Sequence, residues 1–259
     1  MSSVQPMRVN VPVTTLWVSP DQPRPVDAPA IAESPDHGAW LAALDEHPDD
    51  TEDGNGRLGL HGRVDSQLLA GEPVLVVAAP ADAPDWVRIV CPWQPSEHDP
   101  RGYPGWLRRA HLINDDTRGQ ANGPEDESWA LTVQEKEQPV LALARRHLGL
   151  PYLWGGTSPA GLDCSGLVHL VYRELGEIVP RDGHDQQVAA EPVDLDDVEP
   201  GDLYFFAHPG RMAHHVGIVT RRGSMIHAPE VGHGIVEEPL DERRQATLSG
   251  AGRMTRSRS

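Results

Sequence analysis

The order of apolar patterns between residues 137 and 228 is the feature that most constrains the fold of this chain. Two segments carry apolar residues at helical spacing, and three later ones have the length and composition of strands: 137–148 and 165–175, then 202–207, 215–220 and 224–228. Gly176 stands where a helix C-cap would follow the second segment. Two helices followed by a run of strands predict an α+β domain.

The N-terminal half predicts a smaller all-β domain. Residues 7–20 are typical of a pair of strands, and Asp36 is a plausible N-cap for a short helix that ends at Leu44. Three further strands are predicted at the spacing of a small barrel, with Gly, Pro and Asp turns between them: 73–79, 85–91 and 105–112. We therefore expect an N-terminal domain and a C-terminal domain, joined by a polar linker and followed by a disordered tail: 1–115, 137–245, 116–136 and 246–259.

The charge of the chain restricts its partners. The formal net charge is −17, which argues against nucleic acid or an anionic membrane as the main partner, because both attract basic surfaces. An acidic protein would suit a substrate that carries amino groups.

The two cysteines are too few for a disulfide-stapled secreted domain. No basic segment followed by an apolar run marks a signal peptide, and no stretch approaches the roughly 20 apolar residues of a membrane span. We therefore expect a cytoplasmic protein without membrane insertion, or an extracellular or cell-wall protein if a signal has been removed. The oligomeric state is left open.

Cys164 opens the second predicted helix, directly after a glycine-rich turn. A thiol at a helix N-terminus lies at the positive end of the helix dipole, which favours the thiolate. The sequence therefore predicts a lowered thiol pKa and a nucleophile. A single free cysteine is more often an inert buried residue, and Cys91, in an apolar strand, is interpreted in that way.

A nucleophilic cysteine needs a base, and two histidines begin or end successive predicted strands. His215 could accept the thiol proton, and His227 on the next strand could orient its ring. His214 should point to the opposite face, because side chains alternate along a strand.

The segments YLWGG, DCSGLV, PRDGHDQ, PGDLYFF, HHVGIV and MIHAP resemble, in order and approximate spacing, the NlpC-type cell-wall endopeptidases of the papain-like superfamily. The resemblance covers roughly residues 137–240. It implies a cysteine peptidase domain, with helices packed on an antiparallel sheet and no cofactor or metal. It also implies a catalytic triad of Cys164, His215 and His227, with Tyr152 beside the nucleophile.

The N-terminal half is similar to a bacterial SH3-like barrel with a long insertion. Relatives with both domains cleave between γ-D-glutamate and a diamino acid, and some require a free N-terminal L-alanine. The resemblance then implies that Asp163 and Ser165 bind the alanine ammonium, and that Trp154 contacts the substrate. An acidic residue of the barrel, for which Asp99 is the candidate, would also bind the alanine ammonium. The alternative is that Asp163 and Ser165 only cap the helix.

The sequence does not exclude several other functions. Cys164, His215 and His227 could form a zinc site with one open position. The same fold could act as a wall amidase, acyltransferase or transglutaminase-like enzyme, or as a wall-binding protein without activity.

Overall fold

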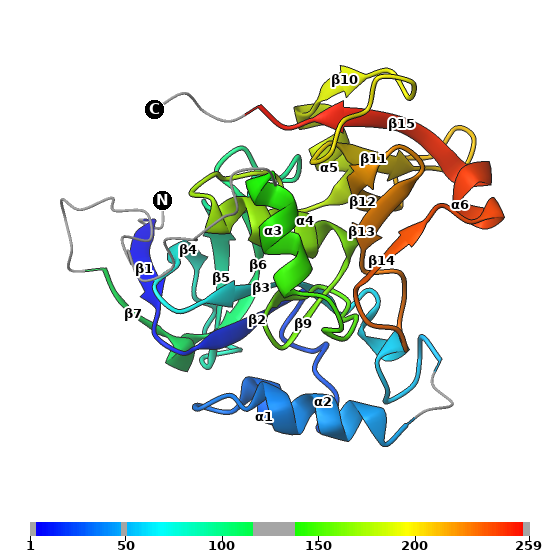
Figure 1. Ribbon diagram of the computed structural model, residues 1–259. Coiled ribbons are helices and arrows are strands. Elements are labelled where there is room, and N and C mark those ends of the chain that lie inside the picture. Colours follow the sequence, from blue (N-terminus) through cyan, green and yellow to red (C-terminus); the bar gives the residue numbers. More distant parts are fainter. Residues whose placement is uncertain (1–3, 48–50, 116–137, 256–259) are drawn as a thin grey trace. The chain divides into compact units, whose positions relative to one another are not determined.

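The computed structural model describes residues 4–47, 51–115 and 138–255, and the chain forms two compact units (Figure 1). The first unit comprises Met1–Arg118 and Tyr152–Leu162, and the second comprises Gly119–Pro151 and Asp163–Ser259. Each unit has its own antiparallel sheet, and helices are present in both, so the chain is α+β as predicted. The predicted linker lies outside the described residues.

The first unit is built on a seven-stranded sheet with the order β3-β2-β6-β5-β4-β1-β7. Its strands are β1 Gln5–Val9, β2 Val13–Trp17, β3 Val64–Leu69, β4 Pro73–Ala78, β5 Trp86–Cys91, β6 Tyr103–Arg108 and β7 Leu112–Asn114. More and less buried residues alternate along β4 and β6, as expected for strands with one face on a core. The predicted strands 73–79 and 85–91 are confirmed, whereas the strand predicted over 105–112 ends at Arg108 and is followed by a 3-10 helix. Residues 7–20 contain two strands as predicted, but β1 and β2 pair with other strands and not with each other. β3 has no predicted counterpart.

Short helices connect the strands of this unit: η1 Pro25–Asp27, α1 Ala28–Ile31, α2 His37–Asp45, η2 Leu58–Leu60 and η3 Arg109–His111. The predicted N-cap of α2 is confirmed, because the Asp36 side chain accepts a hydrogen bond from the Ala39 amide at 2.9 Å. The ring of Trp40 is fully buried, and its Nε1 donates to Asp27 at 2.8 Å, so its polar edge is satisfied inside a second apolar cluster.

The segment Tyr152–Leu162 also belongs to the first unit, and it contains the two-residue strands β8 Thr157–Ser158 and β9 Gly161–Leu162. Thr157 donates from its hydroxyl to the Gln67 carbonyl at 2.9 Å. Gly155 has φ +75°, and a Cβ there would lie 2.6 Å from the side chain of Val64, so only glycine fits this turn. The chain returns to the second unit at Asp163, one residue before Cys164.

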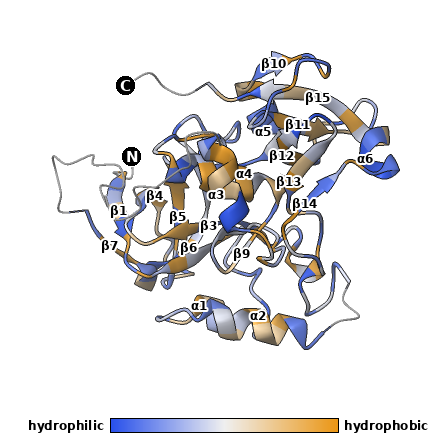
Figure 2. Cartoon of the chain, viewed as in Figure 1, coloured by the Kyte–Doolittle hydropathy of each residue, from blue (hydrophilic) through white to orange (hydrophobic). Residues whose placement is uncertain are grey.

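The second unit is built on a six-stranded sheet with the order β10-β15-β11-β12-β13-β14. Its strands are β10 Glu191–Val193, β11 Leu203–Phe206, β12 His215–Arg221, β13 Ser224–His227, β14 Val236–Pro239 and β15 Leu248–Arg253. Its helices are α3 Pro139–Arg146, α4 Cys164–Glu174, α5 Gly183–Ala189 and α6 Glu242–Thr247. Helices α3 and α4 contact each other and β12. Both helices show hydrophobic residues in Figure 2, whereas α6 is hydrophilic.

The predicted helices and strands of this unit are confirmed, with Gly176 at φ +80° after α4. The prediction of a disordered tail is wrong for Leu248–Arg253, because these residues form β15 between β10 and β11. A Cβ at Gly252 would lie 2.7 Å from the Cβ of Ala190. Close packing therefore selects a small residue here, and the strand loses the apolar alternation that marks strands in a sequence.

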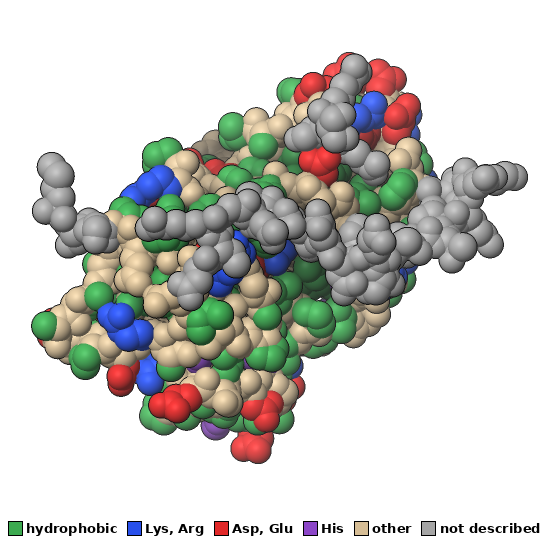
Figure 3. Space-filling model, turned by 90° about the vertical axis from the view of Figure 1, so that its left-hand side faces the viewer, with side chains coloured by type: hydrophobic (Ala, Val, Ile, Leu, Met, Phe, Trp, Pro, Cys, Tyr) green, Lys and Arg blue, Asp and Glu red, His purple; other side chains and the backbone are tan. Residues whose placement is uncertain are grey.

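Among the described residues, no helix has the length and apolar character needed to cross a bilayer. Figure 3 shows one face of the molecule, on which acidic, basic and apolar side chains are scattered among neutral ones.

Candidate active site

Helix α4 places Cys164 at its first position. The Asp163 carboxylate caps the helix by accepting a hydrogen bond from the Gly166 amide at 2.7 Å. The backbone N–H groups of Val216 and Ser165 lie near the Cys164 sulfur and favour its thiolate. Because Val216 follows His215 on β12, the thiol lies beside the start of the strand that carries the predicted base.

The predicted lowering of the thiol pKa is wrong. Burial and, after it, the charge of the adjacent Asp163 carboxylate raise the pKa of Cys164 to about 11. The two backbone N–H groups and the Arg181 guanidinium act in the opposite direction but do not offset burial. The position at a helix N-terminus is therefore insufficient to ionise this thiol, and a base must remove its proton during the reaction.

The two predicted histidines form a hydrogen-bonded pair. Nε2 of His215 lies 2.8 Å from Nδ1 of His227, and the rings meet edge to face with their centroids 5.0 Å apart. Nε2 of His227 lies 3.0 Å from the Glu238 carboxylate on β14. Both histidines are buried, whereas the Glu238 side chain is 47% exposed. The series His215–His227–Glu238 thus runs across three adjacent strands to the protein surface.

These contacts fix the hydrogen positions. An ionised carboxylate only accepts hydrogen bonds, so Nε2 of His227 carries a hydrogen and its Nδ1 accepts from Nε2–H of His215. His215 then has no hydrogen on Nδ1, the nitrogen that a base needs. Burial lowers the pKa of His215 well below its ordinary value, and the Arg244 charge lowers it further. His215 is therefore neutral near pH 7 and able to accept a proton.

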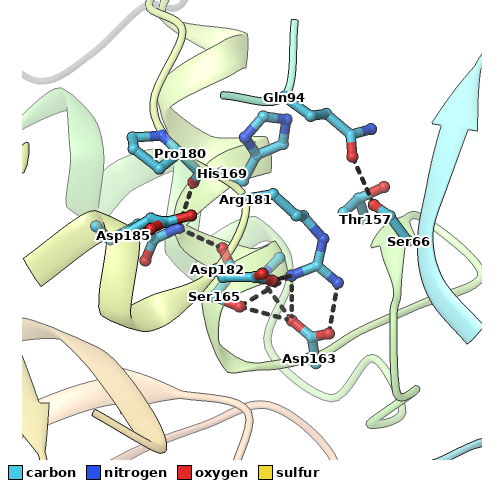
Figure 4. Close-up of polar contacts among 12 residues, drawn as sticks. Ser66, Gln94, Thr157, Asp163, Ser165, His169, Pro180, Arg181, Asp182 and Asp185 are labelled. Carbon is cyan, nitrogen blue, oxygen red and sulfur yellow. Dashed lines mark hydrogen bonds and ion pairs between the residues drawn. The ribbon is translucent and has the colours of Figure 1, made fainter. Parts of the chain in front are cut away.

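A buried ion pair lies behind the nucleophile, and Figure 4 shows the Arg181 guanidinium facing the Asp163 carboxylate. The nitrogen–oxygen distances are 2.6 and 3.1 Å, and Arg181 also donates to the Ser165 hydroxyl at 2.9 Å. Ser165 in turn donates to Asp163 at 3.2 Å. Asp163 therefore caps the helix and neutralises Arg181, whatever else it binds.

The remaining predicted residues belong to the first unit. Tyr152 is buried, and its carbonyl accepts from Arg57 at 3.0 Å. Trp154 is half-exposed, and its Nε1 donates to the Val64 carbonyl at 2.9 Å. Asp99 is paired with Arg101, which lowers the pKa of its carboxyl to about 2. The structure does not test the roles that the resemblance gave to these three residues.

His214 and Cys91, to which the sequence assigns no catalytic role, lie where they were expected. His214 is exposed and stacks on His208, with the centroids 4.8 Å apart, so it faces away from the buried His215. Cys91 is fully buried in the core of the first unit, and burial raises the pKa of its thiol well above the ordinary value.

The zinc alternative does not fit this geometry. Within the described residues, Cys164, His215 and His227 do not form a cluster of converging ligand atoms. The two imidazole nitrogens that face each other are joined by a hydrogen bond. The arrangement is compatible with the predicted roles of a nucleophile, a base and a group that orients the base.

Sequence reasoning missed three residues of this site. Arg181 lies in the PRDGHDQ segment, but its contact with Asp163 spans 18 residues and leaves no periodic signal. Glu238 follows the last predicted strand, and Arg244 lies on a polar helix without an apolar face. Only the pairing of β13 with β14 brings Glu238 beside His227.

A cysteine at the start of a helix, next to a histidine pair on an antiparallel sheet, defines the chain as a cysteine peptidase of papain-like fold. The NlpC/P60 family model matches residues 149–250. The γ-D-glutamyl-L-lysine dipeptidyl-peptidase of Bacillus subtilis is 32% identical over 86% of this chain and 90% of its own length. The enzyme of that name from Bacillus cereus is 27% identical over 90% and 86%.

The crystal structure of an NlpC/P60 family protein from Bacillus cereus superposes with a TM-score of 0.81 at 25% identity, covering 96% of this chain and 99% of that one. The similarity therefore extends over both units. The chain belongs to the NlpC/P60 family.

Proposed function

We propose that this enzyme hydrolyses the amide bond between γ-D-glutamate and a diamino acid in bacterial cell-wall peptides. The observation that carries the proposal is the similarity over nearly the whole chain to two enzymes named γ-D-glutamyl-L-lysine dipeptidyl-peptidase. The relay His215–His227–Glu238 beside Cys164 supports it, because this set can carry out acyl transfer through a thioester.

The chemistry follows from the tautomers. Nδ1 of His215 takes the proton of the Cys164 thiol as the sulfur bonds to the γ-carbonyl carbon. The tetrahedral oxyanion lies within reach of backbone N–H groups at the start of α4. His215 then gives the proton to the leaving amine as the carbon–nitrogen bond breaks. His215 then takes a proton from water as its oxygen bonds to the thioester carbon. The carbon–sulfur bond breaks, the γ-D-glutamyl product leaves as a carboxylic acid, and His215 returns the proton to the Cys164 sulfur.

The proposed substrate begins with a free L-alanine. Its ammonium would be attracted by the Asp163 carboxylate, although that carboxylate already accepts from Arg181 and Gly166. Such a substrate is a wall peptide already trimmed of its sugar, so the proposal places the enzyme in recycling. Tyr152, Trp154 and Asp99 stay predictions from the resemblance.

The bond is tested with the synthetic tripeptides L-Ala-γ-D-Glu-L-Lys and L-Ala-γ-D-Glu-meso-diaminopimelate. Mass spectrometry should detect L-Ala-D-Glu and the free diamino acid with the wild-type enzyme, and neither with Cys164→Ser. Release of a different fragment, or transfer to an added amine in place of water, would show a wall amidase or acyltransferase instead.

The free amine is tested by N-acetylating the same tripeptide. We expect wild type to prefer the free amine by roughly a hundredfold in kcat/KM, and Asp163→Asn to lose most of that preference. Asp163→Asn also weakens the pair with Arg181, so its melting temperature is measured alongside. Equal cleavage of both peptides by wild type would contradict ammonium recognition and leave the bond assignment intact.

A further inference from the structure

Arg244, on α6, lies beside the catalytic histidines although no step of the mechanism uses it. Its guanidinium carbon is 5.8 Å from the centroid of the Phe206 ring, and its Nη2 donates to the Pro229 carbonyl at 3.3 Å. The Phe206 ring is in turn 5.5 Å from the ring of His215. Phe206 pairs with His215 across β11 and β12, so this arrangement is built into the sheet.

The Arg244 charge acts on all three members of the triad. It lowers the pKa of His215 and of His227, in each case after the larger effect of burial. Burial and the neighbouring Arg243 lower the pKa of Arg244 itself, whereas the Cys164 sulfur raises it. The guanidinium therefore lies close enough to the reacting groups to meet a charged part of a bound substrate.

Unlike two other arginines of this unit, Arg244 has no carboxylate partner for its side chain among the described residues. Arg181 is held by Asp163, and Arg243 reaches Glu230 at 3.4 Å. The nearby Asp241 accepts from the backbone N–H of Arg244 and so caps the helix. A half-buried cation paired with only a carbonyl and an aromatic ring can gain a strong charge-assisted bond from an incoming anion.

We propose that Arg244 binds the α-carboxylate of the diamino acid on the leaving side of the scissile bond. His215 must protonate the leaving amine, so the leaving group lies on the imidazole side of Cys164. Arg244 contacts the Phe206 ring, which lies against the imidazole of His215, so Arg244 is on that side. Arg181 is instead bonded to Asp163. The inference rests on the proposed function. An enzyme with this contact would be selective for peptides that end at the diamino acid.

The test compares L-Ala-γ-D-Glu-L-Lys with its C-terminal carboxamide, which has the same scissile bond and lacks the negative charge. Three proteins are compared: wild type, Arg244→Gln and the matched control Arg243→Gln, whose side chain is 71% exposed. Wild type should prefer the carboxylate by about 10- to 100-fold in kcat/KM, the size expected for one charge-assisted hydrogen-bonded pair.

Arg244→Gln should remove this preference by raising KM for the carboxylate more than for the carboxamide, because any effect of the lost charge on the histidines is the same for both substrates. Arg243→Gln should keep the preference. An equal loss on both substrates in Arg244→Gln would overturn the inference, because the preference for the carboxylate would then not depend on Arg244. Equal cleavage of both substrates by wild type would overturn it while the proposed function stands. Cleavage of neither would overturn both.

Discussion

Each unit contains a pair of buried histidines whose pKa values are lowered by burial, but the two pairs have different partners. In the first unit, His37 is bonded to the Thr15 hydroxyl at 3.2 Å, and His111 to the Thr14 hydroxyl and the Ala32 carbonyl, each at 2.7 Å. Burial lowers the pKa of His37 to about 4, and lowers that of His111 too. Their partners are neutral groups that satisfy the rings.

The pair in the second unit has a different set of partners. His215 and His227 are bonded to each other, and the series ends at the Glu238 carboxylate on one side and near a thiol on the other. Burial and a lowered pKa therefore do not by themselves identify a catalytic histidine. The difference lies in the partners, because the second pair is linked to a carboxylate and its strand begins beside a thiol.

The largest expected effect separates the two cysteines. Cys164→Ala should lower kcat by at least about 10⁴-fold, because no other thiol can form the thioester. Cys91→Ala should keep its activity and lose about 1–2 kcal/mol of unfolding free energy, because it opens a small gap in a packed core. Rates on the tripeptide and urea unfolding of both variants measure this. Activity in a folded Cys164→Ala protein would contradict the mechanism.

The second prediction compares the two histidine pairs directly. His215→Ala should lower kcat by roughly 10²- to 10⁴-fold, because the half-buried thiol then has no base. His227→Ala should cost less, since it orients and does not transfer the proton. His111→Gln should leave kcat within about threefold, because it removes no group of the reaction. Steady-state kinetics on one substrate give all three values.

The exposed His214 is the control within the second unit, and His214→Ala should change kcat by less than His215→Ala does. In wild type, the acid limb of kcat/KM should lie below pH 6.5, because burial and Arg244 lower the pKa of His215. An acid limb above pH 6.5, or a larger loss at His214 than at His215, would contradict this assignment of the base.

The third prediction concerns stability, to which buried structural histidines contribute through their neutral form. Burial lowers the pKa of His37 to about 4 and that of His169 to about 3, from 6.5. The unfolded chain therefore binds more protons between these values, so stability is full above pH 6.5 and falls as the pH drops. Between its pKa in the folded chain and 6.5, each histidine lowers the free energy of unfolding by about 1.4 kcal/mol for each pH unit of acidification.

Urea unfolding at pH 7, 6 and 5 measures this slope. His169→Gln can still donate to the Val179 carbonyl, and should reduce the slope by about one histidine's share. His47→Gln, at an exposed position, should leave the slope unchanged. An unaltered slope in His169→Gln would show that this residue is not a source of the acid sensitivity.

The smallest expected effect concerns the end of the relay. Glu238→Gln should lower kcat by only about two- to fivefold, because a half-exposed carboxylate is well screened by water. The neighbouring Glu237 is bonded to Arg145 at 2.9 Å, and Glu237→Gln should leave kcat unchanged. A loss in Glu238→Gln as large as in His227→Ala would instead show that the carboxylate is essential to the tautomer.

The parts of the fold predicted from sequence are those that local pattern determines. Helix α4 and strands β11–β13 carry their own apolar periodicity, and Gly176 marks a helix end. Strand β15 could not be predicted in this way, because Gly250 and Gly252 weaken its apolar pattern, and Gly252 packs too closely against Ala190 for a larger side chain. Its place in the sheet depends on contacts with residues more than 40 positions earlier.

The residues of the site also differ in whether a local sequence pattern indicates them. Cys164, His215 and His227 lie in short motifs, so the sequence could indicate them together. Arg181, Glu238 and Arg244 are brought to the site by pairing or packing across the fold. The thiol pKa was mispredicted for the same reason, because burial depends on the whole fold and outweighs the local helix dipole.

Strand β15 also bears on how this domain is synthesised. Its position between β10 and β11 means that the sheet carrying His215 and His227 lacks an inner strand until residues 248–253 have left the ribosome. Both neighbouring strands would present unpaired edges until then. The last step of sheet assembly must therefore follow translation of residues 248–253. Premature termination shortly before residue 248 would yield a protein that contains Cys164, His215 and His227 and lacks a complete sheet to hold them.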